Sequence, residues 1–283
     1  MINHNSITEI RTLLESEGLT LKKRFGQNFL TDAGMRARIA DAVAAEVAAG
    51  DPSGERELWE IGPGIGSLTA LLVPLGRPLR VFEVDHGLIR VLRREFGSSV
   101  TVEEGDFVRT AARVAGSLSG DGPAAIVGNL PYYSASAMVA AIIDAGIAPP
   151  AMVFLVQAEL ADRFAAVAGG KDYSALSVLV QSHYRVERLF SIPGGAFYPR
   201  PRVGSTVVAL RRRASRPDAR LTASTSEIAR RAFSQRRKTL RNTLRDLVDV
   251  LEELGIDPGL RPEQLSPEQF RDIATARQRR GLS

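Results

Sequence analysis

Polar side chains recur at a fixed interval in the first half of the chain, each near the end of a short apolar segment. They are Glu60, Glu83, Asp106 and Asn129, each 23 residues after the last. The apolar segments read as strands at 57–61, 79–84, 100–103 and 124–128. Their alternation with helical stretches predicts a parallel, doubly wound α/β sheet. Because ligands bind beyond the carboxyl ends of such strands, we expect the four side chains to line one crevice.

The rest of the chain predicts two domains of unequal size. Residues 151–156 read as a fifth buried strand, and alternating segments at 183–192 and 203–210 indicate a final hairpin. Beyond a charged linker, apolar residues at helical spacing predict a small all-helical domain. We therefore place an α/β domain at 1–212 and a basic helical domain at 213–283. Further helices are expected at 7–20 and 32–49.

Composition narrows the classes of site and partner. The 283 residues include no cysteine, which excludes disulfides and thiolate metal sites. The histidines (His4, His86 and His183) lack metal-ligand spacing, so we expect no metal. No apolar run reaches the roughly 18 residues that span a membrane, and the first residues lack the apolar region of a signal peptide. We expect a monomeric, cytoplasmic protein without a membrane partner.

Positive charge is concentrated in one segment. The chain carries a net charge of +5, yet residues 211–245 hold twelve Arg or Lys against only two acids. Such a local excess indicates a polyanionic partner, and we expect Arg236, Arg237 and Lys238 to bind nucleic acid. The alternative is a solvated charged helix face.

A glycine turn follows the first predicted strand, in the segment EIGPGIG at 60–66. Glycines there let a ligand approach the backbone, which makes Gly62 and Gly64 candidate contacts. The dinucleotide fingerprint is G-x-G-x-x-G, whereas the third glycine comes one residue early here. An acidic residue before such a turn is more typical of S-adenosylmethionine sites than of NAD sites.

Two carboxylates follow at the next strand ends. Glu83 is placed to accept hydrogen bonds from both ribose hydroxyls of a cofactor, and Asp106 from an adenine amino group. NAD-binding folds use the same device, so Glu83 does not separate the two cofactors. Asp85 is expected to turn toward the neighbouring helix. The alternative interpretation makes Glu83 and Asp106 helix N-caps.

The segment GNLPYY at 128–133 ends the fourth strand with an amide, a proline and two tyrosines. We expect the Asn129 side-chain oxygen and the Leu130 carbonyl to accept the N–H bonds of an exocyclic amine, which aligns its nitrogen for methyl transfer. Pro131 stiffens the turn, and Tyr132 offers a ring on which a flipped base can stack. The alternative is an Asn-headed structural turn.

Seven segments are together similar to those of a known family and cover nearly everything from residue 20 onward. They are KKRFGQNFLTD (22–32), EIGPGIGSLT (60–69), FEVD (82–85), EGDF (104–107), GNLPYY (128–133), AFYPRPRVGSTVV (196–208) and AFSQRRKTLRNTL (232–244). On these segments the chain resembles the ribosomal RNA small-subunit adenine N6,N6-dimethyltransferases of the KsgA type. The glycine turn occurs in many methyltransferases, whereas the Gln-Asn-Phe-Leu and Gln-Arg-Arg-Lys elements are far more restrictive.

The resemblance implies a Rossmann-like methyltransferase sheet and assigns residues to a cofactor and a base. It implies that S-adenosylmethionine contacts Asn28, Leu30, Gly62, Glu83, Asp106 and Asn129. It also implies that Tyr132 and Phe197 stack on the base. The implied product is dimethyladenosine at two adjacent adenosines near the 3′ end of 16S ribosomal RNA, with a role in small-subunit biogenesis. The implied partner is therefore the small ribosomal subunit and its RNA.

Three other functions remain as alternatives. A resistance-type enzyme that methylates an adenine of large-subunit RNA shares the cofactor site, although the Gln-Arg-Arg-Lys helix favours the small subunit. A ribosome assembly factor with little activity and a NAD-dependent dehydrogenase are the others. Two positions depart from the family pattern: Tyr133 stands where Asn is common, and Gly204 where an acidic residue is usual.

Overall fold

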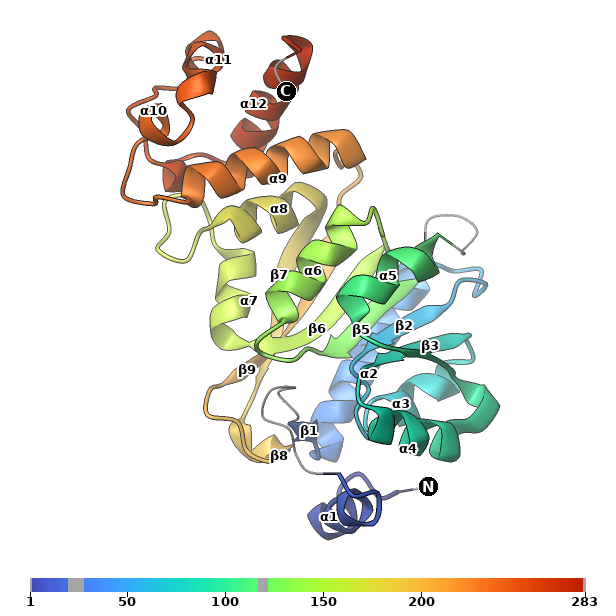
Figure 1. Cartoon of the computed structure of the whole chain (residues 1–283). Coiled ribbons are helices and arrows are strands. Elements are labelled where there is room, and N and C mark those ends of the chain that lie inside the picture. Colours follow the sequence, from blue (N-terminus) through green and yellow to red (C-terminus); the bar gives the residue numbers. More distant parts are fainter. Residues whose placement is uncertain (1, 20–27, 117–121, 282–283) are drawn as a thin grey trace. The chain divides into compact units, whose positions relative to one another are not determined.

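The computed structural model describes residues 2–19, 28–116 and 122–281 (Figure 1). Residues 22–27, part of the segment KKRFGQNFLTD that carries the family resemblance, lie outside these residues. Contacts divide the chain into two compact units. The first consists of Met1–Met138, Ile147–Ala161 and Glu187–Arg211, and the second of Val139–Gly146, Asp162–Val186 and Arg212–Ser283. The second unit thus takes in two segments before the predicted boundary at 212/213.

A seven-stranded sheet forms the first unit, in the order β4-β3-β2-β5-β6-β9-β7. Its strands are β2 (Leu58–Ile61), β3 (Leu79–Glu83), β4 (Thr101–Glu104), β5 (Ala125–Asn129), β6 (Ala151–Gln157), β7 (Tyr184–Ile192) and β9 (Ser205–Arg212). The strands from β4 to β6 pair in parallel, and β9 runs antiparallel to β6. The predicted parallel sheet is confirmed, and each predicted strand lies within two residues of its expected bounds.

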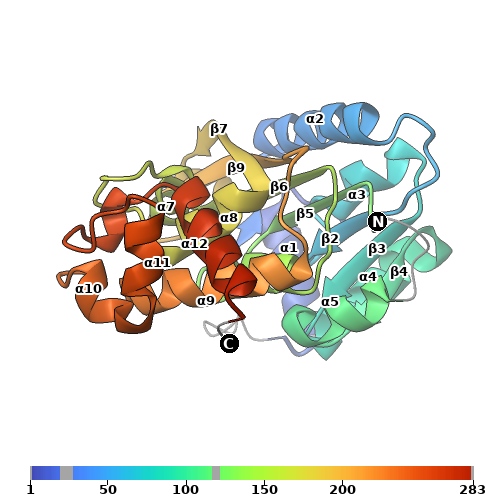
Figure 2. The ribbon, with the colours of Figure 1, turned by 90° about the horizontal axis from the view of Figure 1, so that it is seen from above.

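Helices cover both faces of this sheet, as expected of a doubly wound fold. Helices α2 and α5 lie on opposite faces, which both views show (Figures 1 and 2). The helices that involve this unit are α1 (Ile7–Ser16), α2 (Ala33–Gly50), α3 (Thr69–Leu72), α4 (His86–Phe96), α5 (Phe107–Ala115), α6 (Ala135–Asp144) and α7 (Ala158–Ala165). Aspartates begin three of them, because a carboxylate accepts the unpaired N–H groups of a first turn. These caps are Asp32, Asp85 and Asp106.

The strand register brings the predicted polar residues to one edge. Ile61 pairs with Phe82 on one side and with Gly128 on the other. The residue that follows each of these along its strand is therefore at the same carboxyl edge. These residues are Gly62, Glu83 and Asn129. The regular spacing in the sequence thus corresponds to adjacency in space.

A small second sheet joins two segments that are far apart in the chain. Strand β1 (Phe29–Leu30) pairs antiparallel with β8 (Phe197–Tyr198), so that Leu30 lies opposite Phe197. The predicted hairpin is present as the neighbouring strands β7 and β9, but β8 between them was not predicted. Leu30 and Phe197 are buried in the same apolar cluster as residues of the main sheet.

Five helices and a shared apolar core make up most of the second unit. They are α8 (Ala175–His183), α9 (Ala219–Phe233), α10 (Leu240–Thr243), α11 (Val248–Glu253) and α12 (Pro267–Arg279). Helix α9 contacts both α8 and α12, and fully buried side chains such as Ile228, Leu244 and Phe270 join the helices. The predicted helical region is present, but it shares its core with α8.

Candidate active site

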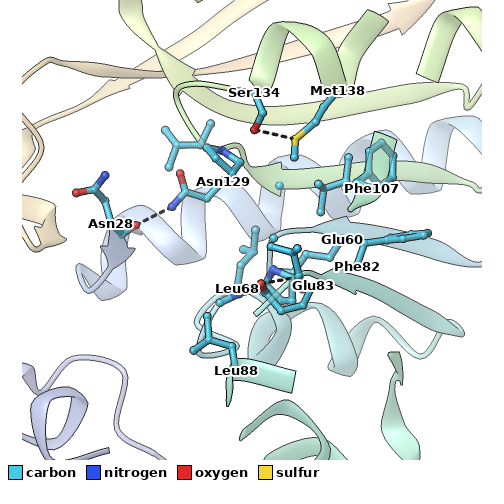
Figure 3. A pocket seen from close by; sticks show the side chains of 18 of the residues that line it. Asn28, Glu60, Leu68, Phe82, Glu83, Leu88, Phe107, Asn129, Ser134 and Met138 are labelled. Atoms are coloured by element: carbon cyan, nitrogen blue, oxygen red, sulfur yellow. Dashed lines mark hydrogen bonds between the residues drawn. The ribbon is translucent and has the colours of Figure 1, made fainter. Parts of the chain in front are cut away.

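A cavity of about 430 Å³ opens at the carboxyl edge of the sheet, within the first unit (Figure 3). Its size is in the range of sites for small molecules and cofactors. Nine of the residues singled out in the sequence line it: Asn28, Leu30, Glu60, Gly62, Gly64, Glu83, Asp106, Asn129 and Pro131. The structure therefore brings the glycine turn, both carboxylates and the Asn-Leu-Pro segment together around one space.

The glycine turn needs glycine at specific positions. Gly66 has a φ of +81°, and a Cβ there would lie 2.3 Å from the ring of Phe96. Gly64 has a φ of +61°, and its Cβ would lie 3.1 Å from Phe29. Both the left-handed backbone and the close packing exclude larger residues. The turn consequently presents bare backbone to the cavity.

Glu83 is held by the backbone around it. Its carboxylate accepts the N–H groups of Val84 at 2.8 Å, Asp85 at 3.0 Å and Gly64 at 3.2 Å. Burial raises its pKa from the ordinary range, and the nearby Asp85 adds to the rise. Glu83 does not cap a helix: the cap of α4 is Asp85, which accepts the Gly87 N–H at 2.9 Å. The expected turn of Asp85 toward that helix is confirmed, and Glu83 remains aimed at the cavity.

Asp106 caps a helix, which was the alternative interpretation of this residue. It is the N-cap of α5, and its Oδ1 accepts the Val108 N–H at 2.9 Å. The side chain is exposed and lines the cavity. A carboxylate has further lone pairs after one such bond, so capping is compatible with contact to a ligand. The contact of Asp106 with a cofactor stays a prediction.

Glu60 forms a buried acidic group beneath the turn. It is 2% exposed, and the Thr69 hydroxyl donates a hydrogen bond of 2.7 Å to its carboxyl group. Burial raises the pKa of Glu60 to about 8, and the charge of Glu83 contributes in the same direction. A neutral Glu60 avoids an uncompensated charge in the core, and a cation in the cavity would favour its ionised form.

We expect the raised pKa of Glu60 to appear in the pH dependence of the protein's stability. Because the pKa of Glu60 is raised to about 8, the folded protein keeps a proton that the unfolded chain releases above its ordinary carboxyl pKa. The free energy of unfolding should therefore fall as pH rises from 5 to 8, by about 2 kcal/mol or more. Glu60→Gln should abolish this fall, whereas Glu104→Gln should retain it. Urea unfolding across this pH range measures the difference, and parallel curves for wild type and Glu60→Gln would contradict the assignment.

Asn129 is oriented by a bond across the cavity mouth. Its Nδ2 donates to the Asn28 carbonyl at 2.9 Å (Figure 3). This bond fixes the amide plane and leaves Oδ1 on the opposite side of the group. Asn28 thus has a positioning contact that no pattern in the sequence indicated. The sequence assigned it only through the family resemblance.

Three residues that were predicted to contact the target base, Leu130, Tyr132 and Phe197, are not among those that line the cavity. Leu130 is 1% exposed, and its N–H donates to the Leu155 carbonyl at 3.0 Å. Tyr132 is half-buried, with its hydroxyl 3.1 Å from the Ser205 hydroxyl. Phe197 is 4% exposed within the core. The carbonyl role of Leu130 and the stacking roles of Tyr132 and Phe197 stay predictions.

Several lining residues were not predicted. Val84 and Val108 line the cavity while 41% and 40% exposed, which is unusual for large apolar side chains next to helix starts. Ser134 and Met138 line it at the start of α6, where the serine hydroxyl lies 3.8 Å from the methionine sulfur. Val84 directly follows Glu83, and this position could have indicated that Val84 lines the cavity. However, an apolar residue at a strand end is equally compatible with a place in the hydrophobic core.

The charged residues that line the cavity are all acidic: Glu60, Glu83 and Asp106. Among the described lining residues there is no lysine, arginine or histidine. A NAD diphosphate carries two negative charges and needs donors or cations. The sulfonium and ammonium groups of S-adenosylmethionine are cations, so the lining suits this cofactor.

A mostly parallel sheet of this topology with an acid-lined cavity beside its glycine turn defines a Rossmann-like, S-adenosylmethionine-dependent methyltransferase. Residues 18–278 match the model of the family described as "Ribosomal RNA adenine dimethylase". The chain belongs to this family.

Relatives support the family over most of the chain. A protein of Pseudomonas aeruginosa named "Ribosomal RNA small subunit methyltransferase A" is 41% identical over 258 residues, which cover 89% of this chain and 93% of the relative. A protein of Chromohalobacter salexigens with the same name is 40% identical over 260 residues and 90% of its length.

Solved structures show the same fold. A dimethyladenosine transferase from Plasmodium falciparum superposes with a TM-score of 0.68 at 22% identity, over 85% of this chain and 96% of that one. The 23S rRNA methyltransferase ErmE superposes with a TM-score of 0.61 at 24% identity, over 88% and 99%. At these identities the likeness concerns the fold.

The basic segment is partly neutralised in the second unit. Within this unit three of its arginines pair with acids, as Arg230–Asp144, Arg231–Asp246 and Arg241–Glu252, and Arg211 at the end of the first unit pairs with Glu46 and Glu187. Arg236, Arg237 and Lys238 are exposed in the turn between α9 and α10, so the expected Gln-Arg-Arg-Lys helix was wrong. A short turn lets successive cations project in different directions.

Neither a membrane-spanning helix nor a metal-binding cluster is present in residues 2–19, 28–116 and 122–281. The helices of these ranges are too short or too polar to span a bilayer. No cluster of three metal-ligating side chains occurs in the same residues.

Proposed function

We propose that this protein transfers methyl groups from S-adenosylmethionine to the N6 amines of two adjacent adenosines near the 3′ end of small-subunit ribosomal RNA. Relatives about 40% identical over 89% of the chain are named for the small subunit, which supports this substrate. The observation that carries the chemistry is the fixed Asn129 amide at the rim of an acid-lined cavity.

The residues of the chain would position the amine. When bound, the cofactor supplies an electrophilic methyl group. The lone pair of an adenine N6 is delocalised into the ring, so the amine needs orientation more than deprotonation. Asn129 Oδ1 and the Leu130 carbonyl would accept its two N–H bonds, and Tyr132 would stack on the ring. The second transfer requires the same site to readmit the monomethylated amine.

The cofactor would be held by the cavity residues at the ends of β2, β3 and β4. Glu83 would accept the ribose hydroxyls, Asp106 the adenine amino group, and the glycine turn would lie against the amino-acid portion. Glu83 already accepts three backbone N–H groups, while a carboxylate has about four lone-pair sites. Binding two hydroxyls therefore requires one backbone bond to lengthen, and the 3.2 Å bond from Gly64 is the longest.

Labelled methyl transfer tests the substrate. We expect transfer to unmethylated small subunits, with mass mapping that finds two dimethyladenosines next to each other. Large subunits serve as the competing substrate, and transfer to them alone would favour the resistance-type alternative. An absence of transfer to either, together with tight small-subunit binding, would favour the assembly-factor alternative.

The basic turn of the second unit gives a separate prediction. We expect the triple variant Arg236→Ala, Arg237→Ala, Lys238→Ala to weaken RNA binding and to flatten its salt dependence by about two to three units of slope. Each lost phosphate contact removes close to one unit. The affinity for S-adenosylmethionine should change by less than about twofold, because that cavity lies in the first unit. An unchanged slope would indicate a solvated charged face.

A further inference from the structure

Tyr133 is the most exposed large apolar side chain among the described residues, at 82%. It lies in the turn between β5 and α6, which closes through the Pro131 carbonyl. That carbonyl accepts the N–H groups of Ser134 at 3.1 Å and Ala135 at 2.9 Å. Pro131 and Ser134 both line the cavity and Tyr133 lies between them in the chain, so its exposed ring belongs to the turn that borders the cavity. The departure from Asn at this position is therefore a change on the outer surface of the site.

The second departure from the family pattern is next in the chain to a residue that this turn contacts, and we call the turn together with residues 200–204 the rim. The Tyr132 hydroxyl is 3.1 Å from the Ser205 hydroxyl, which joins the turn to the first residue of β9. Gly204 immediately precedes Ser205, and a Cβ at Gly204 would meet open space. Val203, two residues before Ser205, is 41% exposed. The rim therefore combines an exposed ring with an exposed aliphatic group.

The charge of this rim differs in sign from that of the cavity. The loop before β9 carries two exposed arginines, Arg200 and Arg202, and no acid between residues 199 and 204. The charged residues that line the cavity are all acidic. A ligand with an apolar planar surface and a negative charge fits the rim, whereas a cation fits the cavity. A nucleotide has both a planar base and an anionic phosphate.

We propose that the rim formed by Tyr133, Arg200, Arg202 and Val203 is a stacking site for a second RNA base, one that neighbours the target adenosine. This proposal rests on the proposed RNA substrate. The Tyr133 ring supplies the stacking surface, and the arginines contact the adjoining phosphates. Two bases would be bound at once: the target enters the cavity beside Tyr132, and its neighbour remains outside on Tyr133.

Steady-state methylation of unmethylated small subunits tests the site. Removing a stacked ring costs about tenfold or more in affinity, so Tyr133→Ala should raise the KM for subunits by that factor. Tyr133→Phe and Tyr133→Trp should stay within about twofold of wild type, because they keep a ring. Val167→Ala, at a side chain 73% exposed in the second unit, is the control for loss of exposed apolar surface.

Charge on the rim gives an independent arm of the experiment. Gly204→Asp places a carboxylate where the structure leaves space, and Gly204→Asn is its neutral match. The aspartate should raise the KM for subunits several-fold more than the asparagine, by an amount that shrinks at high salt. Equal effects of the two substitutions would contradict an anionic ligand at this rim.

Fluorescence reports contact without reference to catalysis. The single tryptophan, Trp59, is fully buried, so Tyr133→Trp adds an exposed reporter. A protein-free RNA hairpin with two adjacent adenosines in its loop should quench this reporter at saturation. No quenching, a KM for Tyr133→Ala near wild type, or a Tyr133→Ala variant that also loses cofactor affinity and thermal stability would each overturn the proposal. Absence of methyl transfer by wild type would instead contradict the proposed function.

Discussion

Replacing Asn129 with alanine is expected to lower methyl transfer to small subunits by a factor of about 10² to 10³, while subunit binding persists. Removal of one preorganised polar group that acts on the reacting centre has effects of this size. The side chain lies at the end of β5, and its Nδ2 is bound to the Asn28 carbonyl at 2.9 Å. Alanine removes both the acceptor and this orienting bond. Single-turnover transfer and subunit binding would be measured side by side.

The variant Asn129→Asp distinguishes loss of the acceptor oxygen from loss of the orienting bond to the Asn28 carbonyl. Aspartate keeps an acceptor oxygen but cannot donate to the Asn28 carbonyl. If orientation of the amide matters as proposed, Asp should be less active than wild type and more active than Ala. A parallel collapse of subunit binding in Asn129→Ala would show that the residue is structural, and the assignment would then fail.

Replacing Glu83 with alanine is expected to weaken S-adenosylmethionine binding by about 100-fold or more. Hydrogen bonds to a charged group contribute about 1.5–3 kcal/mol each, and ribose hydroxyls would make two. The same carboxylate links Gly64 of the glycine turn to the loop before α4. Its loss should therefore also lower the melting temperature. Calorimetric titration of the cofactor and thermal unfolding measure the two effects.

Glu104→Ala is the matched control for this substitution. Glu104 ends β4, the strand next to β3, but its side chain is 40% exposed and pairs with Arg93 at 2.6 Å outside the cavity. We expect cofactor affinity to change by less than about twofold in this variant. A similar loss in both variants would mean that general negative charge, and not the ribose contact, explains the effect of Glu83.

Local sequence patterns predicted those features that depend on neighbours along the chain. Strand spacing predicted the sheet, because parallel strands in register bring residues at equal positions to one edge. The glycine turn was predictable because only glycine adopts its left-handed backbone at Gly64 and Gly66. Asp85, which was expected to turn toward the neighbouring helix, is the N-cap of α4. Asp106 was ambiguous, since one aspartate can both cap a helix and face a cavity.

Local sequence patterns could not predict the contacts between segments that are far apart in the chain. Nothing local in β1 or β8 indicates that Leu30 pairs with Phe197, because two-residue strands have no periodicity to detect. The same holds for the bond from Asn129 to Asn28 and for the approach of Tyr132 to Ser205. The family resemblance supplied Asn28 and Leu30, but not the contacts that position them.

The sequence by itself determined the class of sheet, the edge at which the site lies and the polar residues at the strand ends that line it. Hydrophobic periodicity and backbone requirements act over a few residues, so they can be recognised in the amino-acid sequence. Only the tertiary structure decided what those residues meet. It buries Glu60 so that its pKa rises to about 8, and it orients Asn129 through Asn28. It also leaves the Tyr133 ring exposed at the rim. Burial and hydrogen-bond partners arise from segments that meet only on folding, and these determine the chemistry.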